Sequence, residues 1–335
     1  MKLLKSIAIL GLASIAGGVN AADNLTVYSY RQAFLIDPIL EKFTQDTGIK
    51  VDVVFSKNGI AERIQREGKL SPADIVLTSD FSRLIELVKK DLVAPIESDV
   101  INHNIPSQYR APDHTWYALT KRVRNIYSSK ERLGKLDINY EDLASAQYKG
   151  KVCTRSGKHP YNVALVASMI AHHGEVEAKQ WLSGFKANLA RKPQGNDRAQ
   201  VKAVKEGLCD IAIGNSYYLG KMLADPKQKS WADSVYLNFP NQANRGSHVN
   251  VSGMALTKYS PNKDNAVKLM EYLTSPIAQQ AYAEVNFEYP VNPQVKPSSL
   301  VASWGEYKAD ALPIYKLAEY HQAAMKLLDE VKFDL

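Results

Sequence analysis

The sequence predicts a two-lobed α/β protein, in which each lobe is a mixed sheet flanked by helices and a hinge joins the lobes around a central cleft. Two observations support this prediction. The 335 residues exceed what a single core usually holds. Strand-like and helix-like segments also alternate along the chain without a long Gly/Ser linker. Two lobes without a flexible linker indicate a cleft that closes by hinge motion.

The first third of the mature chain alternates in the order that builds a parallel sheet. Strands are predicted at residues 25–30, 49–55 and 73–78. Each strand is followed by a predicted helix. The first helix opens with Asp37 and Pro38, the second covers residues 60–69 and the third covers residues 81–92. This β-α-β-α-β rhythm predicts parallel strands with helices on both faces of the sheet.

A second series of elements begins with a strand at 116–127, which we expect to cross between the lobes. Its later strands and helices are predicted at residues 151–154, 178–189, 198–207, 210–214 and 235–239. In open α/β sheets, ligands bind beyond the carboxyl ends of the strands. The loops after Tyr30, Thr154 and Gly214 are therefore the places to search for a site.

The N-terminus has the features of a secretory signal peptide. Lys2 and Lys5 precede an apolar run at 7–16 that is too short for a permanent membrane span, and Val19-Asn20-Ala21 predicts cleavage after Ala21. The region has no cysteine for a lipid anchor. We expect a soluble periplasmic protein without membrane insertion; an uncleaved anchor helix is the alternative.

Composition argues against nucleic-acid binding. Loss of residues 1–21 lowers the formal net charge from +7 to +5, and the basic residues are scattered without an arginine-rich run. Two cysteines remain, Cys153 and Cys209, each just before an apolar run. Export makes a disulfide between them plausible, and two free buried thiols are the alternative.

Motifs of catalysis are absent, so we expect a protein that is not an enzyme and has no catalytic residues. The chain has no phosphate-binding Gly-rich loop, no G-x-G-x-x-G, no G-x-S-x-G, no C-x-x-C and no H-E-x-x-H. His172 and His173 are adjacent, and adjacent residues do not share a helix face. This pair indicates the end of a helix rather than a zinc site.

Tyrosine offers the candidate chemistry. Tyr217 and Tyr218 directly follow the strand at 210–214, and at the first turn of a helix their side chains diverge by only about 100°. Two phenol oxygens can then reach one point, where the helix dipole favours phenolate. Tyr161 occupies a similar place after the strand at Cys153. Ordinary packing of these rings is the alternative.

Ferric iron is the ion that such a site would suit. It is small, hard and trivalent, so it prefers anionic oxygen, and three phenolates would neutralise its charge. Arg31, at the end of the first strand, and Arg122 and Arg124, on the crossing strand, would support the phenolates or capture an anion. Plain surface charge is the alternative for these arginines.

Several motifs together resemble one known family. They are Asn215-Ser216-Tyr217-Tyr218, Gly195-Asn196-Asp197-Arg198-Ala199-Gln200, Ser252-Gly253-Met254-Ala255 and Glu288-Tyr289-Pro290-Val291-Asn292-Pro293. Across nearly the whole mature chain, the sequence is similar to the periplasmic ferric-ion-binding proteins of bacterial iron ABC transporters. These are relatives of the transferrin lobe with the type II periplasmic binding protein fold.

The resemblance implies a site. Tyr217, Tyr218 and Tyr161 would bind Fe³⁺. Family members often carry His-Tyr after the arginine of the first strand, but Gln32 and Ala33 follow Arg31 here. The missing positions would be filled by water or by a synergistic anion such as carbonate. The resemblance further implies anion-binding or supporting roles for Arg31, Arg124, Arg122, Gln32, Ser156, Asn196 and Asn215, with Tyr30 as a substitute ligand.

The resemblance also implies discontinuous lobes, with crossings near 119–124 and 250–253. The first lobe would comprise residues 22–122 and 252–300, and the second residues 123–251 and 301–335. A monomer would deliver iron to an inner-membrane ABC permease and its ATPase. The alternatives are a carrier of a small organic or anionic solute, of the phosphonate or polyamine type, and a periplasmic hydrolase.

Overall fold

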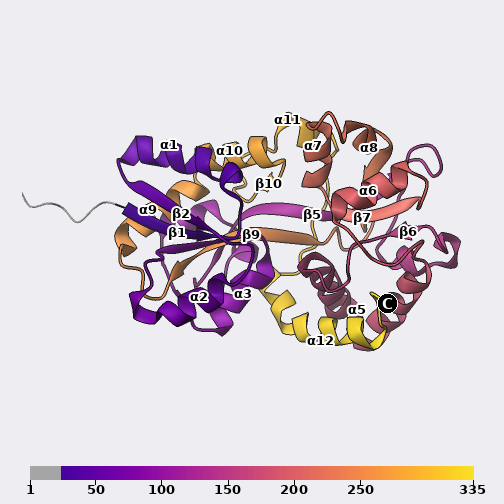
Figure 1. The fold of residues 1–335 in the computed structure, drawn as a ribbon, viewed down its shortest axis with the longest axis horizontal. Helices are drawn as coiled ribbons and strands as arrows, with labels where there is room; N and C mark the ends of the chain where they lie inside the picture. Colours follow the sequence, from indigo (N-terminus) through magenta and orange to yellow (C-terminus); the bar gives the residue numbers. More distant parts are fainter. Residues whose placement is uncertain (1–23) are drawn as a thin grey trace, which may run out of the picture.

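The computed structural model describes residues 24–335, and the predicted signal peptide lies outside them. The chain forms two α/β lobes joined by long strands (Figure 1). Ten strands form one hydrogen-bonded network along the path β2-β1-β3-β9-β5-β7-β6, with β4, β8 and β10 beside it. The two-lobed mixed α/β fold predicted from the sequence is thereby confirmed.

One lobe is built on the predicted β-α-β-α-β unit. The strands β1 (Asn24–Ser29), β2 (Lys50–Phe55) and β3 (Ile75–Thr78) are parallel, with β1 between the other two. Three amphipathic helices follow them, α1 (Asp37–Thr47), α2 (Ile60–Glu67) and α3 (Phe81–Lys89). Helix α1 ends where Gly48 adopts a φ of 76°, a left-handed conformation that favours glycine.

Two long strands, β5 (Tyr117–Ser129) and β9 (Val249–Thr257), join the lobes (Figure 1). Strand β5 pairs with β9 as far as Val123 and with β7 from Arg124 onward. The change of partner falls within the predicted crossing at 119–124. This pairing supports, as a proposal, the predicted division into residues 22–122 with 252–300 and residues 123–251 with 301–335.

The other lobe contains β6 (Val152–Cys153), β7 (Ile211–Asn215) and β8 (Val235–Asn238). Its helices are α5 (Pro160–Ala187), α6 (Asp197–Lys205), α7 (Tyr217–Leu223) and α8 (Lys229–Asp233). Helix α5 is kinked at Gly174, which has a φ of 82°. The His172-His173 pair lies just before this kink, so its interpretation as a helix end is confirmed.

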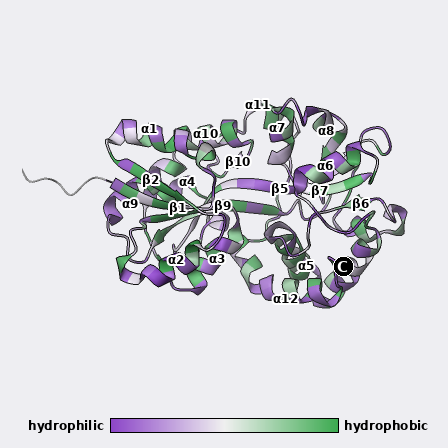
Figure 2. Ribbon diagram, in the orientation of Figure 1, coloured by the Kyte–Doolittle hydropathy of each residue, from purple (hydrophilic) through white to green (hydrophobic). Residues whose placement is uncertain are grey.

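The remaining elements are β4 (Val93–Ala94), α4 (Asp99–Asn104), α9 (Lys263–Thr274), α10 (Pro276–Asn286), β10 (Tyr289–Pro290), α11 (Ser299–Ala302) and α12 (Leu317–Glu330). Helix α12 packs along α5, where the Phe333 and Phe185 ring centroids lie 5.1 Å apart. Figure 2 shows mostly hydrophobic residues in β9 and a mixture of hydrophobic and hydrophilic residues along the peripheral helices. Within residues 24–335, no helix is both long and apolar enough to cross a bilayer.

A disulfide joins Cys153 and Cys209, whose Cα atoms are 5.9 Å apart. It links β6 to the segment that enters β7, and these two strands pair in parallel. The structure thus answers the question that the sequence left open between a disulfide and free thiols. Because Tyr161 and Tyr217 follow these two strands, the disulfide also constrains the segments that carry them.

Replacing both cysteines by alanine should lower the free energy of unfolding by about 4 kcal/mol. The bridge closes a loop of sequence separation 56 and so restricts the unfolded chain. Without the bridge, the unfolded chain regains conformational entropy, which lowers its free energy by roughly this amount. Guanidinium unfolding of the variant measures the change. Reduced wild-type protein should lose a similar amount, and a loss below about 1 kcal/mol in both would contradict this role.

Candidate metal centre in the interlobe cleft

A cavity of about 260 Å³ lies where the two lobes face each other. Elements from both halves of the predicted division contribute to it. Its lining residues include tyrosines and cations in unusual number: Tyr30, Arg31, Gln32, Leu35, Ser79, Arg122, Tyr161, Arg198, Tyr217, Tyr218, Lys221, Asn286 and Glu288. The three tyrosines predicted to bind metal therefore line one cavity.

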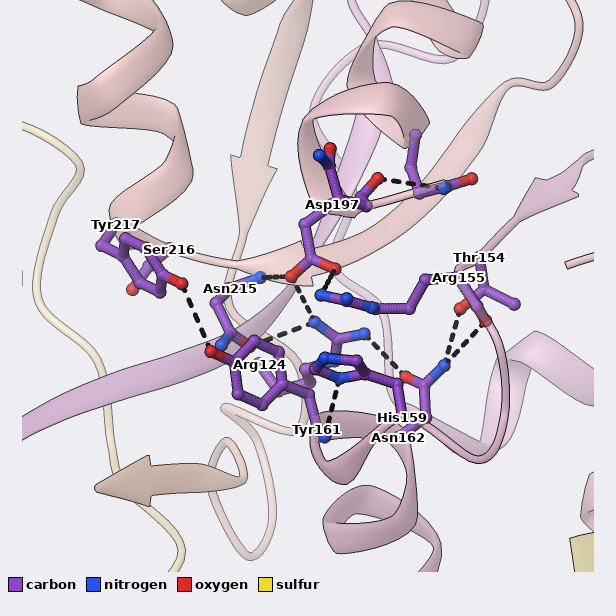
Figure 3. Close-up of polar contacts among 12 residues, drawn as sticks. Arg124, Thr154, Arg155, His159, Tyr161, Asn162, Asp197, Asn215, Ser216 and Tyr217 are labelled. Atoms are coloured by element: carbon purple, nitrogen blue, oxygen red, sulfur yellow. Dashed lines mark hydrogen bonds and ion pairs between the residues drawn. The ribbon is translucent and has the colours of Figure 1, made fainter. Parts of the chain in front are cut away.

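The phenol groups approach one another closely. The hydroxyl oxygens of Tyr161 and Tyr217 are 3.4 Å apart, and Figure 3 shows them pointing at each other. The rings of Tyr217 and Tyr218 lie side by side, with centroids 4.1 Å apart and planes inclined by 32°. Tyr161 and Tyr217 are each only 8% exposed, so most of each side chain is shielded from bulk water.

Local structure fixes the tyrosine pair. Strand β7 ends at Asn215, and the backbone N–H of Ser216 donates to the carbonyl of Val123 at 2.9 Å, so the chain stays attached to β5 as α7 begins. On α7, a Cβ added to Gly220 would lie 2.4 Å from the Phe287 ring. Glycine there allows α7 to approach the other lobe's chain closely.

Tyr161 lies in the first turn of α5. Pro160 occupies the first helical position, and the Tyr161 N–H donates to Nδ1 of His159 at 3.2 Å. The His159 and Tyr161 rings meet edge to face at 4.5 Å. Burial, with Arg155 nearby, lowers the pKa of His159 to about 3, so the imidazole stays neutral and accepts this bond.

The adjacent tyrosines are held as neutral phenols. Burial raises the pKa of Tyr217 well above its usual value, and the neighbouring Tyr161 and Tyr218 raise it further. Burial likewise raises the pKa of Tyr218, again with a contribution from Tyr161. Desolvation therefore outweighs the helix dipole that the sequence argument invoked. Deprotonation of this pair requires a cation at the oxygens.

Asp197 organises the charges behind the tyrosines (Figure 3). Its fully buried carboxylate accepts from Arg124 Nη1 at 2.7 Å, from Arg155 Nη1 at 3.2 Å and from the Asn215 backbone N–H at 2.9 Å. Burial alone would raise the pKa of this carboxyl, but Arg124 and Arg155 outweigh it and hold the pKa below its usual range. Arg124 also donates to Asn162 Oδ1 at 2.6 Å.

Glu288 is a second buried carboxylate that pairs with two arginines, Arg31 and Arg122. It accepts from Arg31 Nη2 at 2.8 Å and from the Thr120 hydroxyl at 2.5 Å, and it lies 3.1 Å from Arg122 Nη2. Burial would raise its pKa, but Arg122 and Arg31 lower it to about 2. Nε and Nη1 of Arg31 have no hydrogen-bond partner within the described residues, so they can serve an anion.

The alternative reading of the three arginines as surface charge is wrong, because Arg31, Arg122 and Arg124 are all buried. Only Arg31 and Arg122 line the cavity, since Arg124 lies behind Tyr161 with its guanidinium 5.8 Å from the ring centroid. Arg122 also donates to the carbonyl of Ser79 at 2.6 Å.

The other predicted residues divide between the cavity and its surroundings. Gln32 and Tyr30 line it, but the Tyr30 hydroxyl accepts from the Ala61 N–H at 3.4 Å. Asn215 lies behind it and accepts from Arg124 at 3.1 Å.

Ser156 and Asn196, like Arg124 and Asn215, do not line the cavity. The Ser156 hydroxyl donates to Asp334 at 2.6 Å, and Asn196 caps α6 by accepting from the Ala199 N–H at 3.0 Å. Both side chains are engaged in holding local structure.

Sequence reasoning missed Asp197, Glu288, Arg155, Arg198 and Lys221. Asp197 and Glu288 stood in the quoted motifs, yet nothing in those motifs indicates that each carboxylate lies between two arginines. Lys221 could have been found by helical spacing, since it follows Tyr217 by one turn.

The donor set restricts which metal ions would fit. Within residues 24–335, no three His, Cys, Asp or Glu side chains are grouped so that they could hold a metal ion. The grouped oxygen donors are the phenols of Tyr161, Tyr217 and Tyr218. Such hard oxygen donors suit a hard cation rather than a thiolate-preferring one.

Comparison with known proteins identifies the family of this chain. The family model of the bacterial extracellular solute-binding proteins matches residues 28–280. Iron uptake protein A1 of Synechocystis sp. is 40% identical over 322 residues, which cover 95% of this chain and 89% of that protein. The major ferric iron-binding protein of Neisseria meningitidis is 32% identical, covering 84% of this chain and 85% of its own length.

Solved structures give the same result. Ferric iron-binding protein A of Mannheimia haemolytica, in an open conformation, superposes with a TM-score of 0.90 at 54% identity over 94% of this chain and all of that one. A Trichodesmium protein in complex with iron and citrate superposes with a TM-score of 0.89 at 39% identity, over 92% and 99% of the two chains. This chain therefore belongs to the bacterial extracellular solute-binding protein family, among its ferric iron-binding relatives.

Proposed function

We propose that this chain is a periplasmic ferric iron-binding protein that delivers Fe³⁺ to an ABC importer. Tyr161, Tyr217 and Tyr218 would bind the ion as phenolates. The observation that carries this proposal is the 3.4 Å approach of the Tyr161 and Tyr217 hydroxyls in an interlobe cavity that Tyr218 also lines. Three phenolates would balance the three charges of ferric iron, whereas with a divalent ion they would leave one negative charge in excess.

The relatives support the function at the level of their names, which describe iron uptake, ferric iron binding and a periplasmic location. These are names of transport and binding proteins, in keeping with a carrier that turns nothing over. The partners would be an inner-membrane permease and its ATPase, as is usual for a solute-binding protein. The carrier would act as a monomer after a signal peptide is cleaved off behind Ala21.

A synergistic anion such as carbonate would complete the coordination. The other lobe brings Arg31 and Gln32 to the cavity, where members of the resembled family often have a His-Tyr pair. The unpartnered Nε and Nη1 of Arg31 are the donors best suited to such an anion, with Arg122 beside them. Arg124 would act from behind Tyr161.

An organic anion bound without metal is the second candidate, because the cavity is rich in cations. A polyamine is disfavoured for the same reason, since the one carboxylate among the lining residues is Glu288, which already neutralises two arginines. Colour separates the first two candidates. Phenolate bound to ferric iron gives a charge-transfer band in the visible, whereas an organic anion alone gives none.

Replacing both Tyr217 and Tyr218 by phenylalanine should abolish that band and weaken ferric iron binding by more than about a hundredfold. Residues behind a metal ligand already contribute about ten- to a hundredfold, so two direct ligands should contribute more. Titration with a ferric chelate, followed at the visible band, measures the loss. Tyr236→Phe, on an exposed tyrosine, is the matched control. Undiminished iron affinity in the double variant would refute the ligand assignment.

Iron binding should weaken steeply as the pH falls. The raised pKa values of Tyr217 and Tyr218 keep both phenols protonated in the free protein at neutral pH, so iron must displace their protons. Binding through these two phenolates would release about two protons per ion. Each would change the apparent affinity by about tenfold per pH unit.

Proton release in an unbuffered titration, with chelator competition between pH 6 and pH 8, measures this linkage. The competition must be corrected for protonation of the chelator. Uptake of iron without release of protons would contradict binding through phenolates.

A further inference from the structure

The sheet network is narrowest where the two lobes meet. On the first-lobe side, β5 also pairs with β10 at Lys121, and β9 also pairs with β3 from Gly253. On the second-lobe side, β5 pairs with β7 from Arg124 onward. At Arg122 and Asn250, the strands β5 and β9 have only each other as strand partners within the described residues. Because a two-stranded ribbon bends more easily than a wider sheet, motion between the lobes would concentrate there.

This bending would take place two residues away from the side chain that holds the tyrosine segments together. The Arg124 guanidinium donates to Asn162 Oδ1 at 2.6 Å and to Asn215 Oδ1 at 3.1 Å. Asn162 directly follows Tyr161 in the chain. Asn215 precedes Tyr217 by two residues. A rotation of the backbone at Arg124 would therefore displace both tyrosine segments and disturb the approach of their phenol oxygens.

Tyr140 fastens Arg124 at the point where β5 leaves the ribbon. Its hydroxyl donates to the Arg124 carbonyl and accepts from the His248 backbone N–H at 3.1 Å. The Arg124 N–H in turn donates to the His248 carbonyl at 3.0 Å. The phenol oxygen thus lies between the two strands, in the place where a direct bond of the antiparallel ladder would otherwise form. It closes the ribbon just past its narrowest point.

Tyr140 is itself anchored to the second lobe. Its side chain is buried, its N–H donates to Asn241 Oδ1 at 3.0 Å, and its carbonyl accepts from Trp181 Nε1 on α5 at 2.7 Å. Burial raises the pKa of Tyr140, so the hydroxyl keeps the proton that it donates to Arg124. Tyr140 is therefore a fixed point to which both connecting strands are attached.

Resting on the ferric site proposed above, we propose that Tyr140 is a positioning residue, whose hydroxyl stops hinge bending before Arg124 and so keeps Tyr161 and Tyr217 aligned while the lobes open and close. The lobes would then move as rigid bodies about the ribbon at Arg122 and Asn250. The tyrosine side of the site would stay assembled in both states of the cleft.

The first test needs no iron. Amide hydrogen exchange in the metal-free protein, resolved by NMR, compares wild type with Tyr140→Phe, which keeps the ring and removes the hydroxyl. Exchange at Arg124 and His248 should become at least tenfold faster relative to the amides of β1, because the hydrogen bonds that close the ribbon are lost. Tyr117→Phe is the matched control, since that buried hydroxyl also donates to a backbone carbonyl, that of Ile96, on the first-lobe side. It should leave both amides unchanged.

The second test uses the iron-loaded protein. Release of iron to an excess of a competing chelator, followed at the visible charge-transfer band, should be at least tenfold faster in Tyr140→Phe. The band should also shift, because the phenol oxygens are no longer held in one arrangement. Tyr117→Phe should release iron at the wild-type rate and keep the wild-type band. Circular dichroism verifies that both variants fold.

Each other outcome is decisive. Unchanged exchange at Arg124 and His248, as expected if the strands close into a direct bond, overturns the role of Tyr140. Faster exchange without faster iron release overturns its link to the tyrosines. A wild-type protein without the visible band refutes the ferric site instead, and the exchange data then still decide whether Tyr140 stops the bending. If Tyr140→Phe does not fold, the wild-type spectra decide. Exchange there should be slower at Arg124 and His248 than at Arg122 and Asn250, and the reverse order overturns the proposal.

Discussion

The buried ion pairs of Asp197 are the constraint on which the geometry of the site depends. A carboxylate with no exposure is tolerable only when cations and hydrogen-bond donors surround it, and here Arg124, Arg155 and the Asn215 backbone do so. These partners come from β5, from the loop before α5 and from the end of β7. Because Tyr161 and Tyr217 follow two of these segments, one interaction sets the relative position of two phenol groups that are 56 residues apart in sequence.

The electrostatics of the free site explain why the phenols would lose their protons only when a metal ion binds. Desolvation keeps Tyr217 and Tyr218 neutral, although cations lie nearby. The carboxylates of Glu288 and Asp197 compensate part of the positive charge of these cations. A trivalent ion would reverse the balance by charging the phenols as it arrives. The tyrosines and the cations therefore have different tasks. The phenols would discriminate by charge and hardness, while Arg31 and Arg122 would hold the anion that accompanies the ion.

Much of this arrangement follows from the sequence because it depends on local pattern. The alternation of strands and helices, the glycine at the end of α1 and the position of Tyr217 directly after β7 are readable from spacing and residue type. Pairings between distant residues are not readable in this way. Glu288 between Arg31 and Arg122, and the disulfide of Cys153, depend on how β5, β6, β7 and β10 come together in three dimensions. Ser156 and Asn196 show the converse, since loops near a site also need polar groups for their own turns and caps.

We infer that three phenol oxygens converge on one ferric ion between the lobes. Anomalous diffraction at the iron edge from crystals of the iron-loaded protein tests it most directly. We expect a single strong peak at about 2 Å, the usual metal–oxygen distance, from the oxygens of Tyr161, Tyr217 and Tyr218. A peak coordinated by carboxylates or histidines elsewhere, or one bound by only a single tyrosine, would contradict it.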